Sequence, residues 1–318
     1  GYRDDDLDGR IKYLCDESFA DPSYCYDHDY GIPGRFDIFG PNAEVDFFTD
    51  ANPSRESYSV YAQTTYSLAD AFRIVSGLRY SEDTFTTDVT NFLNVESFQE
   101  EGTTDEITSR VVAEVDFSED LMGYFALAKG FKPGGSNLTF GFDDDNAPPM
   151  VFPTFEAETV DSVEFGLKST FADGAARANI AVFSYTYENL QFQATDPDIY
   201  RGGVANIPES EMSGLEIEFT GFLTDSLSLD MNLAFLDSEV TSDYEVLDIV
   251  DAYPYFFGQE DIRYGLRENV KGNQLAKTPE LTADITLKHE TNLASGNSLI
   301  TLVQFVKRGN FQQRVSNN

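Results

Sequence analysis

The stretch YFALAKGFKPGGSN, residues Tyr124–Asn137, begins as a β-strand and ends as a loop. Pro133 cannot donate a hydrogen bond to a neighbouring strand, and Gly134 and Gly135 tolerate positive φ angles, so strand pairing is expected to stop there. A very short turn, residues 118–120, precedes this strand, whereas the long loop 133–156 follows it. The same contrast, short at one end of a strand and long at the other, is repeated along the chain.

Alternating apolar and polar residues predict strands throughout the chain from Ser54 onward. Between Ser54 and Leu68, Tyr58, Val60 and Tyr66 share one face while polar residues occupy the other, which is the period of two of a strand with one apolar face. In the next strand Arg73 and Arg79 lie on the polar face, which indicates water on that side. Ten strands are expected in all, within residues 54–68, 72–80, 107–117, 124–132, 163–171, 175–193, 215–219, 227–235, 281–287 and 299–307.

The length of these strands favours a membrane protein. Many have 12 or more residues, against about 5–6 in soluble sheets and about 9–11 for a strand that crosses a bilayer. Backbone groups in lipid must all be paired, so such strands cross only as a closed barrel. The predicted fold class is therefore all-β: an antiparallel up-and-down transmembrane β-barrel with short periplasmic turns and long extracellular loops at 87–106, 133–156 and 241–276. Its apolar face is expected to meet lipid and its charged face a wet lumen.

The amino-acid composition limits the classes of partner that the chain can bind. The chain has no run of 18 apolar residues, 14% aromatic residues, and a net charge of −35, which excludes a nucleic-acid backbone as partner. Acidic residues concentrate in residues 1–53, with thirteen Asp or Glu against four Lys or Arg, and in residues 241–276, with seven against three. These acidic loops are either simply solvated or recruit cations. The predicted organisation is a long acidic extracellular loop region, 1–53, followed by barrel strands, 54–318.

The two cysteines, Cys15 and Cys25, lie close together in the irregular first segment. A disulfide that pins a long loop fits an oxidising compartment, and two thiols without further ligands would make a poor zinc site. Charged residues rather than an apolar core follow Gly1, so no signal peptide is recognised and the start is expected to be processed or truncated.

Asp4, Asp6 and Asp8 precede Gly9 in the pattern D-x-D-x-D-G, which is the first half of a calcium-binding loop. Cys15 occupies the twelfth position, where such a loop has a bidentate acid, and acidic residues follow only at 16 and 17. The alternatives are a Ca²⁺ site on an extracellular loop and a solvated acidic tip. No other cofactor is expected.

The sequence contains no catalytic constellation. His28 and His289 are far apart, and neither has a Ser or Cys partner at a recognisable spacing. The glycine pairs at 134–135 and 202–203 have no helix after them to receive a phosphate. The protein is therefore not expected to be an enzyme.

Three cations near the loop ends of the strands, Lys129, Lys132 and Arg201, are candidates for holding an anionic solute such as a chelated metal. The alternative is that they are wall charges that balance Glu164 and other acids of the lumen.

The chain resembles the barrel of the TonB-dependent outer-membrane receptors from about Ser54 to its end. Six stretches carry the resemblance in the family's order: Gly77–Tyr80 with Glu82 and Asp83; Tyr124 through Lys129–Gly135 and Asn137; Glu158 and Thr159 with Glu164–Lys168; Phe183 and Tyr185; Ser213–Glu218; and Gly272–Leu275 with Thr278 and Pro279.

This resemblance implies a 22-stranded barrel in the outer membrane of a Gram-negative bacterium, filled by a separate N-terminal plug. Such a receptor imports a large, scarce solute such as a ferric siderophore, with energy relayed by the TonB complex through the plug. No plug is recognised before the strands, and the end lacks the terminal aromatic strand, so about ten strands of a larger barrel are expected. Two alternatives remain: a complete ten-stranded barrel acting as a pore or enzyme, and a soluble secreted β adhesin.

Overall fold

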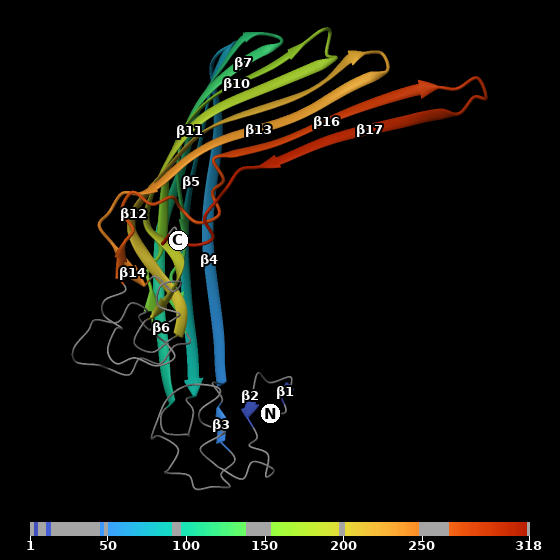
Figure 1. The fold of residues 1–318 in the computed structure, drawn as a ribbon. Coiled ribbons are helices and arrows are strands. Elements are labelled where there is room, and N and C mark those ends of the chain that lie inside the picture. The colour runs from blue at the N-terminus through green and yellow to red at the C-terminus, as the bar shows by residue number, and fades with distance from the viewer. Residues whose placement is uncertain are drawn as a thin grey trace.

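The computed structural model describes residues 3–5, 11–13, 45–47, 50–90, 97–137, 154–196, 201–247 and 267–316. Most of these residues belong to one ten-stranded antiparallel sheet (Figure 1). Its strands are β4 (Asp50–Ala69), β5 (Phe72–Thr90), β6 (Ser97–Ser118), β7 (Leu121–Lys132), β10 (Glu158–Phe171), β11 (Ala176–Asp196), β12 (Arg201–Thr224), β13 (Leu227–Val240), β16 (Leu281–Asn292) and β17 (Ser298–Arg308). Within the described ranges, no helix is long and apolar enough to cross a membrane.

Each long strand pairs with the next one along the chain, in the order β17-β16-β13-β12-β11-β10-β7-β6-β5-β4. The connections at one end are tight hairpin turns, such as the turn through Asp173 and Gly174, which both have positive φ angles of 53° and 86°. Figure 1 shows these turns at the same end of the sheet. The predicted up-and-down arrangement of antiparallel strands is confirmed.

Shorter strands are built from the long connections. β8 (Gly135–Ser136) pairs with β9 (Thr154–Phe155), and β14 (Glu245–Leu247) pairs with β15 (Arg267–Asn269). Near the N-terminus, β1 (Arg3–Asp5), β2 (Ile11–Tyr13) and β3 (Val45–Phe47) form a separate three-stranded sheet. The segment after β13 and the segment before β16 pack together in a small buried core at the loop end of the sheet, made of Ile207, Val240, Val246, Val270, Leu275 and Val315.

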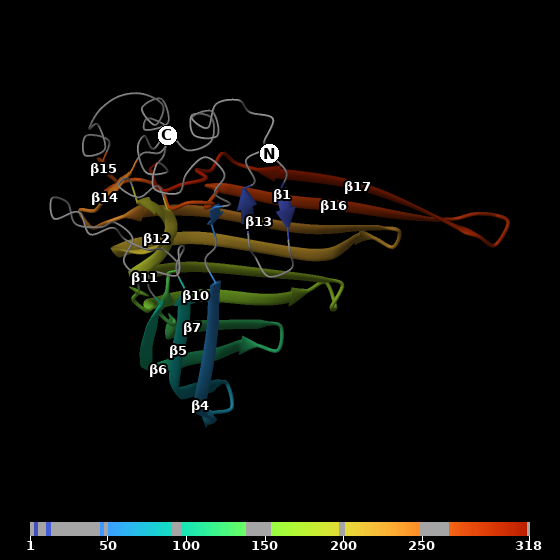
Figure 2. The ribbon, with the colours of Figure 1, turned by 90° about the horizontal axis from the view of Figure 1, so that it is seen from below.

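The sheet is open in the described residues. β4 and β17 are its two edges, and they are not paired with each other. Figure 2 shows β4 and β17 at opposite extremes of a curved and twisted sheet. A complete ten-stranded barrel requires a ladder between these two strands, so this alternative from the sequence is wrong for the structure.

One face of the sheet is apolar and exposed. Directly opposed residues of antiparallel strands share a face, and the register links Phe125 to Phe165 and Phe165 to Val182. These three side chains are 44%, 52% and 52% exposed. The same face carries further exposed apolar side chains from one edge strand to the other, among them Tyr66, Leu78, Val111, Leu127, Val163, Ile180, Phe235, Leu287, Val303 and Phe305. No second layer of described residues covers this face, as expected for a surface that meets lipid.

The predicted loop 87–106 is largely wrong. β5 continues to Thr90 and β6 begins at Ser97, and their ladder runs without interruption to the pair Thr90↔Ser97. The acidic residues of this stretch suggest a loop, but the stretch also contains several Thr, Phe and Val residues, which favour strands. The Phe85 ring covers Gly102 on the neighbouring strand, and the hydroxyls of Thr84 and Thr103 form a hydrogen bond of 3.0 Å. These strands therefore project beyond the apolar band. β4 likewise begins at Asp50, before the predicted start at Ser54.

Candidate functional site

The residues Pro133–Asn137, here called the strap, fold over one face of the sheet and tie distant strands together. The Arg55 guanidinium on β4 donates to the Gly134 carbonyl at 2.6 Å, and the hydroxyls of Thr87 on β5 and Ser136 lie 2.5 Å apart. On the far side, Asn137 donates to the Val204 carbonyl and accepts from its N–H, both at 2.8 Å. Asn137 thus pairs with β12 as a neighbouring strand would.

The contacts of the strap show which face of the sheet is concave. β5 and β12 are separated in the sheet by β6, β7, β10 and β11, so a five-residue segment reaches both only from the inside of the curve. Thr87 is buried to 2% exposure at this contact. Arg55, Arg73 and Arg79 share the face of Thr87, because β4 and β5 alternate without a shift over these positions. The arginines of β5 therefore lie on the concave side, in agreement with the alternation.

The glycines of the strap allow its close approach. A Cβ atom at Gly135 would lie 2.7 Å from the Phe155 ring of β9, and one at Gly134 would lie 2.5 Å from the Phe155 carbonyl oxygen. Both distances are too short for any side chain. Gln191 of β11 also donates to the Pro133 carbonyl at 3.0 Å. The sequence Pro-Gly-Gly thus ends the strand β7 and permits the backbone to lie against β9.

A cavity of about 420 Å³ lies between β4, β5, β6 and β7 and reaches Pro133, the first residue of the strap. The ladder between β6 and β7 ends at the pair Ser109↔Lys129, although both strands continue toward the loop end. The cavity is lined mainly by hydroxyl-bearing and charged residues, together with Pro133, the first residue of the strap. The lining residues are Ser57, Tyr58, Ser59, Arg79, Ser81, Glu82, Asp83, Thr108, Lys129, Gly130, Phe131 and Pro133.

The charges around the cavity are unequally neutralised. Arg55 lies 3.2 Å from the Asp83 carboxylate, and Lys129 lies 3.4 Å from Glu106. Arg79, in contrast, donates only to hydroxyl oxygens, those of Ser59 at 2.9 Å and Ser81 at 3.0 Å. Its guanidinium forms no ion pair within the part of the chain that the structure describes. Glu82 also lines the cavity, where it accepts a hydrogen bond from the Tyr80 hydroxyl at 3.1 Å, so the cavity offers both a cation and an anion to a polar group.

The concave wall toward the turn end is polar and internally bonded. Arg73 forms a forked ion pair with Glu114 and Asp116, with both short contacts at 2.5 Å. Tyr124 donates to Glu164 at 2.5 Å, and the ammonium of Lys168 lies 5.4 Å from the Tyr124 ring centroid. Such a wall suits contact with water or with a polar protein segment rather than with lipid.

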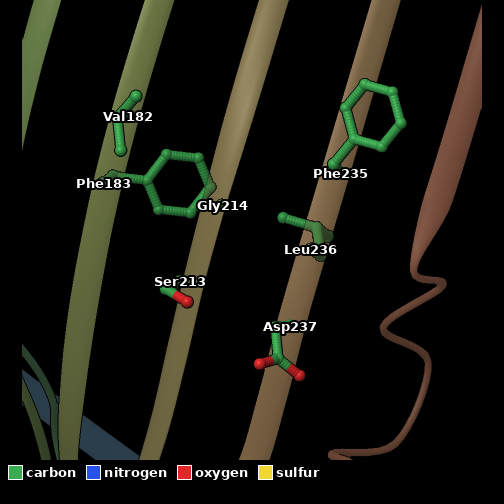
Figure 3. Close-up of a pocket in the computed structure, with 7 residues that line it drawn as sticks. All are labelled: Val182, Phe183, Ser213, Gly214, Phe235, Leu236 and Asp237. Carbon is green, nitrogen blue, oxygen red and sulfur yellow. The ribbon is translucent and has the colours of Figure 1, made fainter.

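A second depression, of about 300 Å³, has a different character. It is lined by Val182, Phe183, Ser213, Gly214, Phe235, Leu236 and Asp237 on three adjacent strands (Figure 3). In Figure 3 the Phe183 ring is turned toward Gly214. A Cβ at Gly214 would lie 2.6 Å from that ring and 2.8 Å from Leu236. The depression is the space left by a glycine that accommodates its aromatic neighbour, and Ser213 and Asp237 are the polar side chains among its lining residues.

The structure places the predicted site residues unequally. Lys129 lines the cavity, whereas Lys132 is exposed at the end of β7, opposite Glu158 in the ladder. Arg201 is the first residue of β12, and the structure describes its backbone only. The backbone of Asp4 lies in β1, opposite Lys12. Asp6, Asp8, Cys15 and Cys25 lie outside the described residues, so the calcium and disulfide predictions stay predictions.

Two site residues are not identified as such by the sequence. The alternation places Arg79 on the wet face, but its position in a cavity depends on where the ladder of β6 and β7 ends. Asn137 stands out only as part of a motif, and its pairing with Val204 joins residues 67 positions apart. Among side chains in the described part of the chain, no group of three His, Cys, Asp or Glu is arranged to hold a metal ion.

Known proteins with similar sequences are receptors. The chain is 28% identical over 200 residues to the pesticin receptor of Yersinia enterocolitica, which covers 60% of this chain and 27% of that receptor. It is also 28% identical over 197 residues to the probable TonB-dependent siderophore receptor PiuA of Acinetobacter baumannii, covering 60% of this chain and 25% of PiuA. The chain thus spans about a quarter of the length of these curated relatives.

Solved structures share the fold. The ferric yersiniabactin uptake receptor FyuA of Yersinia pestis matches with a TM-score of 0.66 and 19% identity, over 85% of this chain and 36% of FyuA. The siderophore receptor PiuA of Acinetobacter baumannii matches with a TM-score of 0.56 and 20% identity, over 77% of this chain and 32% of PiuA. The family profile described as "TonB dependent receptor-like, beta-barrel" matches residues 6–317. The chain therefore belongs to the β-barrel family of the TonB-dependent receptors.

Proposed function

We propose that this chain is part of the barrel wall of an outer-membrane receptor that takes up a ferric siderophore or a similar large chelate with TonB-coupled energy. The observation that carries the proposal is the two-faced sheet of a family member, which has an apolar exposed convex face and a polar concave face, with a polar cavity next to Pro133 of the strap. The similar receptors and solved structures are named as siderophore or pesticin receptors.

The membrane assignment follows from the family. TonB-dependent receptor barrels are outer-membrane proteins of Gram-negative bacteria, and this chain lies in that membrane. The convex face supplies the apolar surface that contact with lipid requires. A soluble adhesin would need to cover Phe125, Phe165 and Val182 with a second layer of protein.

The concave face supports transport. It offers hydroxyls and guanidinium groups that bind oxygen-rich anions. Iron enters this proposal as cargo held by the chelate. The partners of the complete receptor are, in the proposal, the ferric chelate on the outside and the TonB complex on the periplasmic side.

The test is uptake of radioactive iron by a strain that lacks its own siderophore receptors and expresses the full-length gene that contains this chain. We expect iron-limited cells to accumulate ⁵⁵Fe from at least one ferric siderophore, and to lose this uptake when tonB is deleted. Uptake that persists without TonB, or a panel of ferric chelates with no uptake above the empty vector, would refute the proposal.

A further inference from the structure

We infer that the depression between β11, β12 and β13 is a lipid site on the convex face. It takes one acyl chain of a phospholipid and binds the primary ammonium of an ethanolamine headgroup. The inference goes beyond the proposed function, because it concerns the membrane around the protein and not the transported solute.

The open part of the depression faces the membrane. On the concave side of Gly214 the space is filled, since a Cβ atom there would lie 2.6 Å from the Phe183 ring and 2.8 Å from Leu236. The other lining residues lie on the convex face, because they alternate with these residues along their strands. They are Val182, Ser213, Phe235 and Asp237.

The depression crosses the border of the apolar band. Val182 and Phe235 belong to one row of the ladder, since both are direct partners of Leu215, and they are 52% and 43% exposed. Ser213 and Asp237 are direct partners in the next convex row toward the loop end. Because the convex face meets lipid, methylene groups rather than water fill the apolar half of the depression. An apolar half beside a polar half fits an acyl chain that continues into a headgroup.

The polar half carries uncompensated negative charge. Asp237 is exposed and forms no ion pair with any described residue. In the next row of the same face, Glu211 and Glu239 are direct partners, and both are also exposed and without an ion pair in the described ranges. Like charges directly opposite each other in a ladder are destabilising, so a cation bound here would stabilise the border of the band.

An ammonium group fits this charge better than a metal ion does. Across the side chains that the structure describes, no three acidic, His or Cys residues are arranged to hold a metal ion. A primary ammonium needs no closed set of ligands, because its three N–H donors can bind separate acceptors such as the Asp237 carboxylate and the Ser213 hydroxyl. A headgroup that has a phosphate but no amine would be repelled by the same carboxylates. The chemistry therefore selects an ethanolamine phospholipid.

The experiment measures lipid binding to the purified full-length receptor that contains this chain, by native mass spectrometry. The probes are phosphatidylethanolamine, phosphatidylcholine and phosphatidylglycerol with the same acyl chains, so that only the headgroup differs. Asp237→Asn removes the carboxylate charge at nearly constant size, and Ser213→Leu fills the depression. Asp161→Asn is the matched control, because Asp161 is an exposed acid of the convex face on β10 that does not line the depression. Heat-modifiable migration confirms that each variant is folded.

We expect the wild type to bind the ethanolamine lipid about threefold to tenfold more strongly than the other two lipids. Asp237→Asn should abolish this preference without changing binding of the choline lipid, which has no N–H donor in its headgroup. Ser213→Leu should weaken binding of all three lipids, and Asp161→Asn should change none.

Equal binding of the three lipids by the wild type would overturn the site, because lipid that merely surrounds the barrel gives that result. A preference that persists in Asp237→Asn, a Ser213→Leu variant that binds like the wild type, or an equal loss in Asp161→Asn would overturn it as well. The assay contains no chelate, so a failure of ⁵⁵Fe uptake refutes the proposed function alone, and a failure of lipid selectivity refutes the lipid site alone.

Discussion

The ring of Tyr124 lies over Gly166, its direct partner on the neighbouring strand, and leaves no room for a Cβ atom there. From this position the Tyr124 hydroxyl donates a hydrogen bond to Glu164, and the Lys168 ammonium lies 5.4 Å from the centroid of the ring. The pairs Phe85 with Gly102 and Phe183 with Gly214 have the same arrangement. Each aromatic ring covers backbone that a glycine would otherwise leave open, so glycine inside these strands is compensated across the ladder.

Replacing Gly166 by alanine should displace the Tyr124 ring and disturb its hydrogen bond with Glu164. We expect a loss of about 1–3 kcal/mol in the free energy of unfolding, as for other insertions into packed sites. Urea unfolding of the full-length receptor in detergent, followed by fluorescence, measures it. Gly77→Ala is the matched control on the same face, because its nearest contacts would be at 3.7 Å or more. Equal stability of the two variants would contradict this account of the pair.

Replacing Asn137 by alanine should release the strap from β12. The Val204 N–H and carbonyl both lose their partner, and an unsatisfied buried polar group costs about 1–3 kcal/mol. We expect faster hydrogen exchange in peptides that contain Val204, with little change in the ladder of β5 and β6. Asn292→Ala, at an exposed strand end, serves as the control. Unchanged exchange at Val204 would show that the side-chain bonds do not hold the strap.

Replacing Phe165 by arginine should impair insertion into a bilayer. The side chain lies in the apolar band of the convex face, where an arginine costs about 2 kcal/mol or more. We expect a lower folded fraction in liposomes, measured by heat-modifiable migration. Asn232→Arg places the same charge on the concave face and should fold normally. If the two variants insert equally well, the assignment of lipid to the convex face is wrong.

The hydrogen bond from Lys271 to Asp243, at 3.1 Å, together with one from Asn269, lowers the pKa of the Asp243 carboxyl below its ordinary value. A lowered folded-state pKa stabilises this loop above the ordinary Asp pKa, and the contribution is lost as pH falls through the lowered value. Both side chains are exposed, so the effect should be small and weaken with salt. Lys271→Gln should move the titration of Asp243 upward, which carboxyl-labelled NMR can follow. The same titration curve in both proteins would contradict the assigned cause.

The sequence predicts where the strands are and which residues share a face, because side chains alternate between the two faces of any strand, whichever strands it pairs with. The alternation of Val163 and Phe165 with Glu164 is enough to separate the lipid face from the wet face. Strand ends are less readable: the acids between 87 and 106 suggest a loop, whereas cross-strand contacts such as Thr84 with Thr103 extend the ladder through them. The charges within a segment do not show whether that segment pairs with another strand.

The sequence by itself determined an all-β antiparallel wall with short turns, long loops and two unlike faces, since alternation and turn residues are local properties of the chain. Only the tertiary structure decided that the strap crosses the inside of the curve from β4 and β5 to β12, and that Arg79 lines a cavity there without a carboxylate partner among the described residues. Those relationships depend on ladder register and sheet curvature, which join residues many positions apart and leave no periodic trace in the sequence.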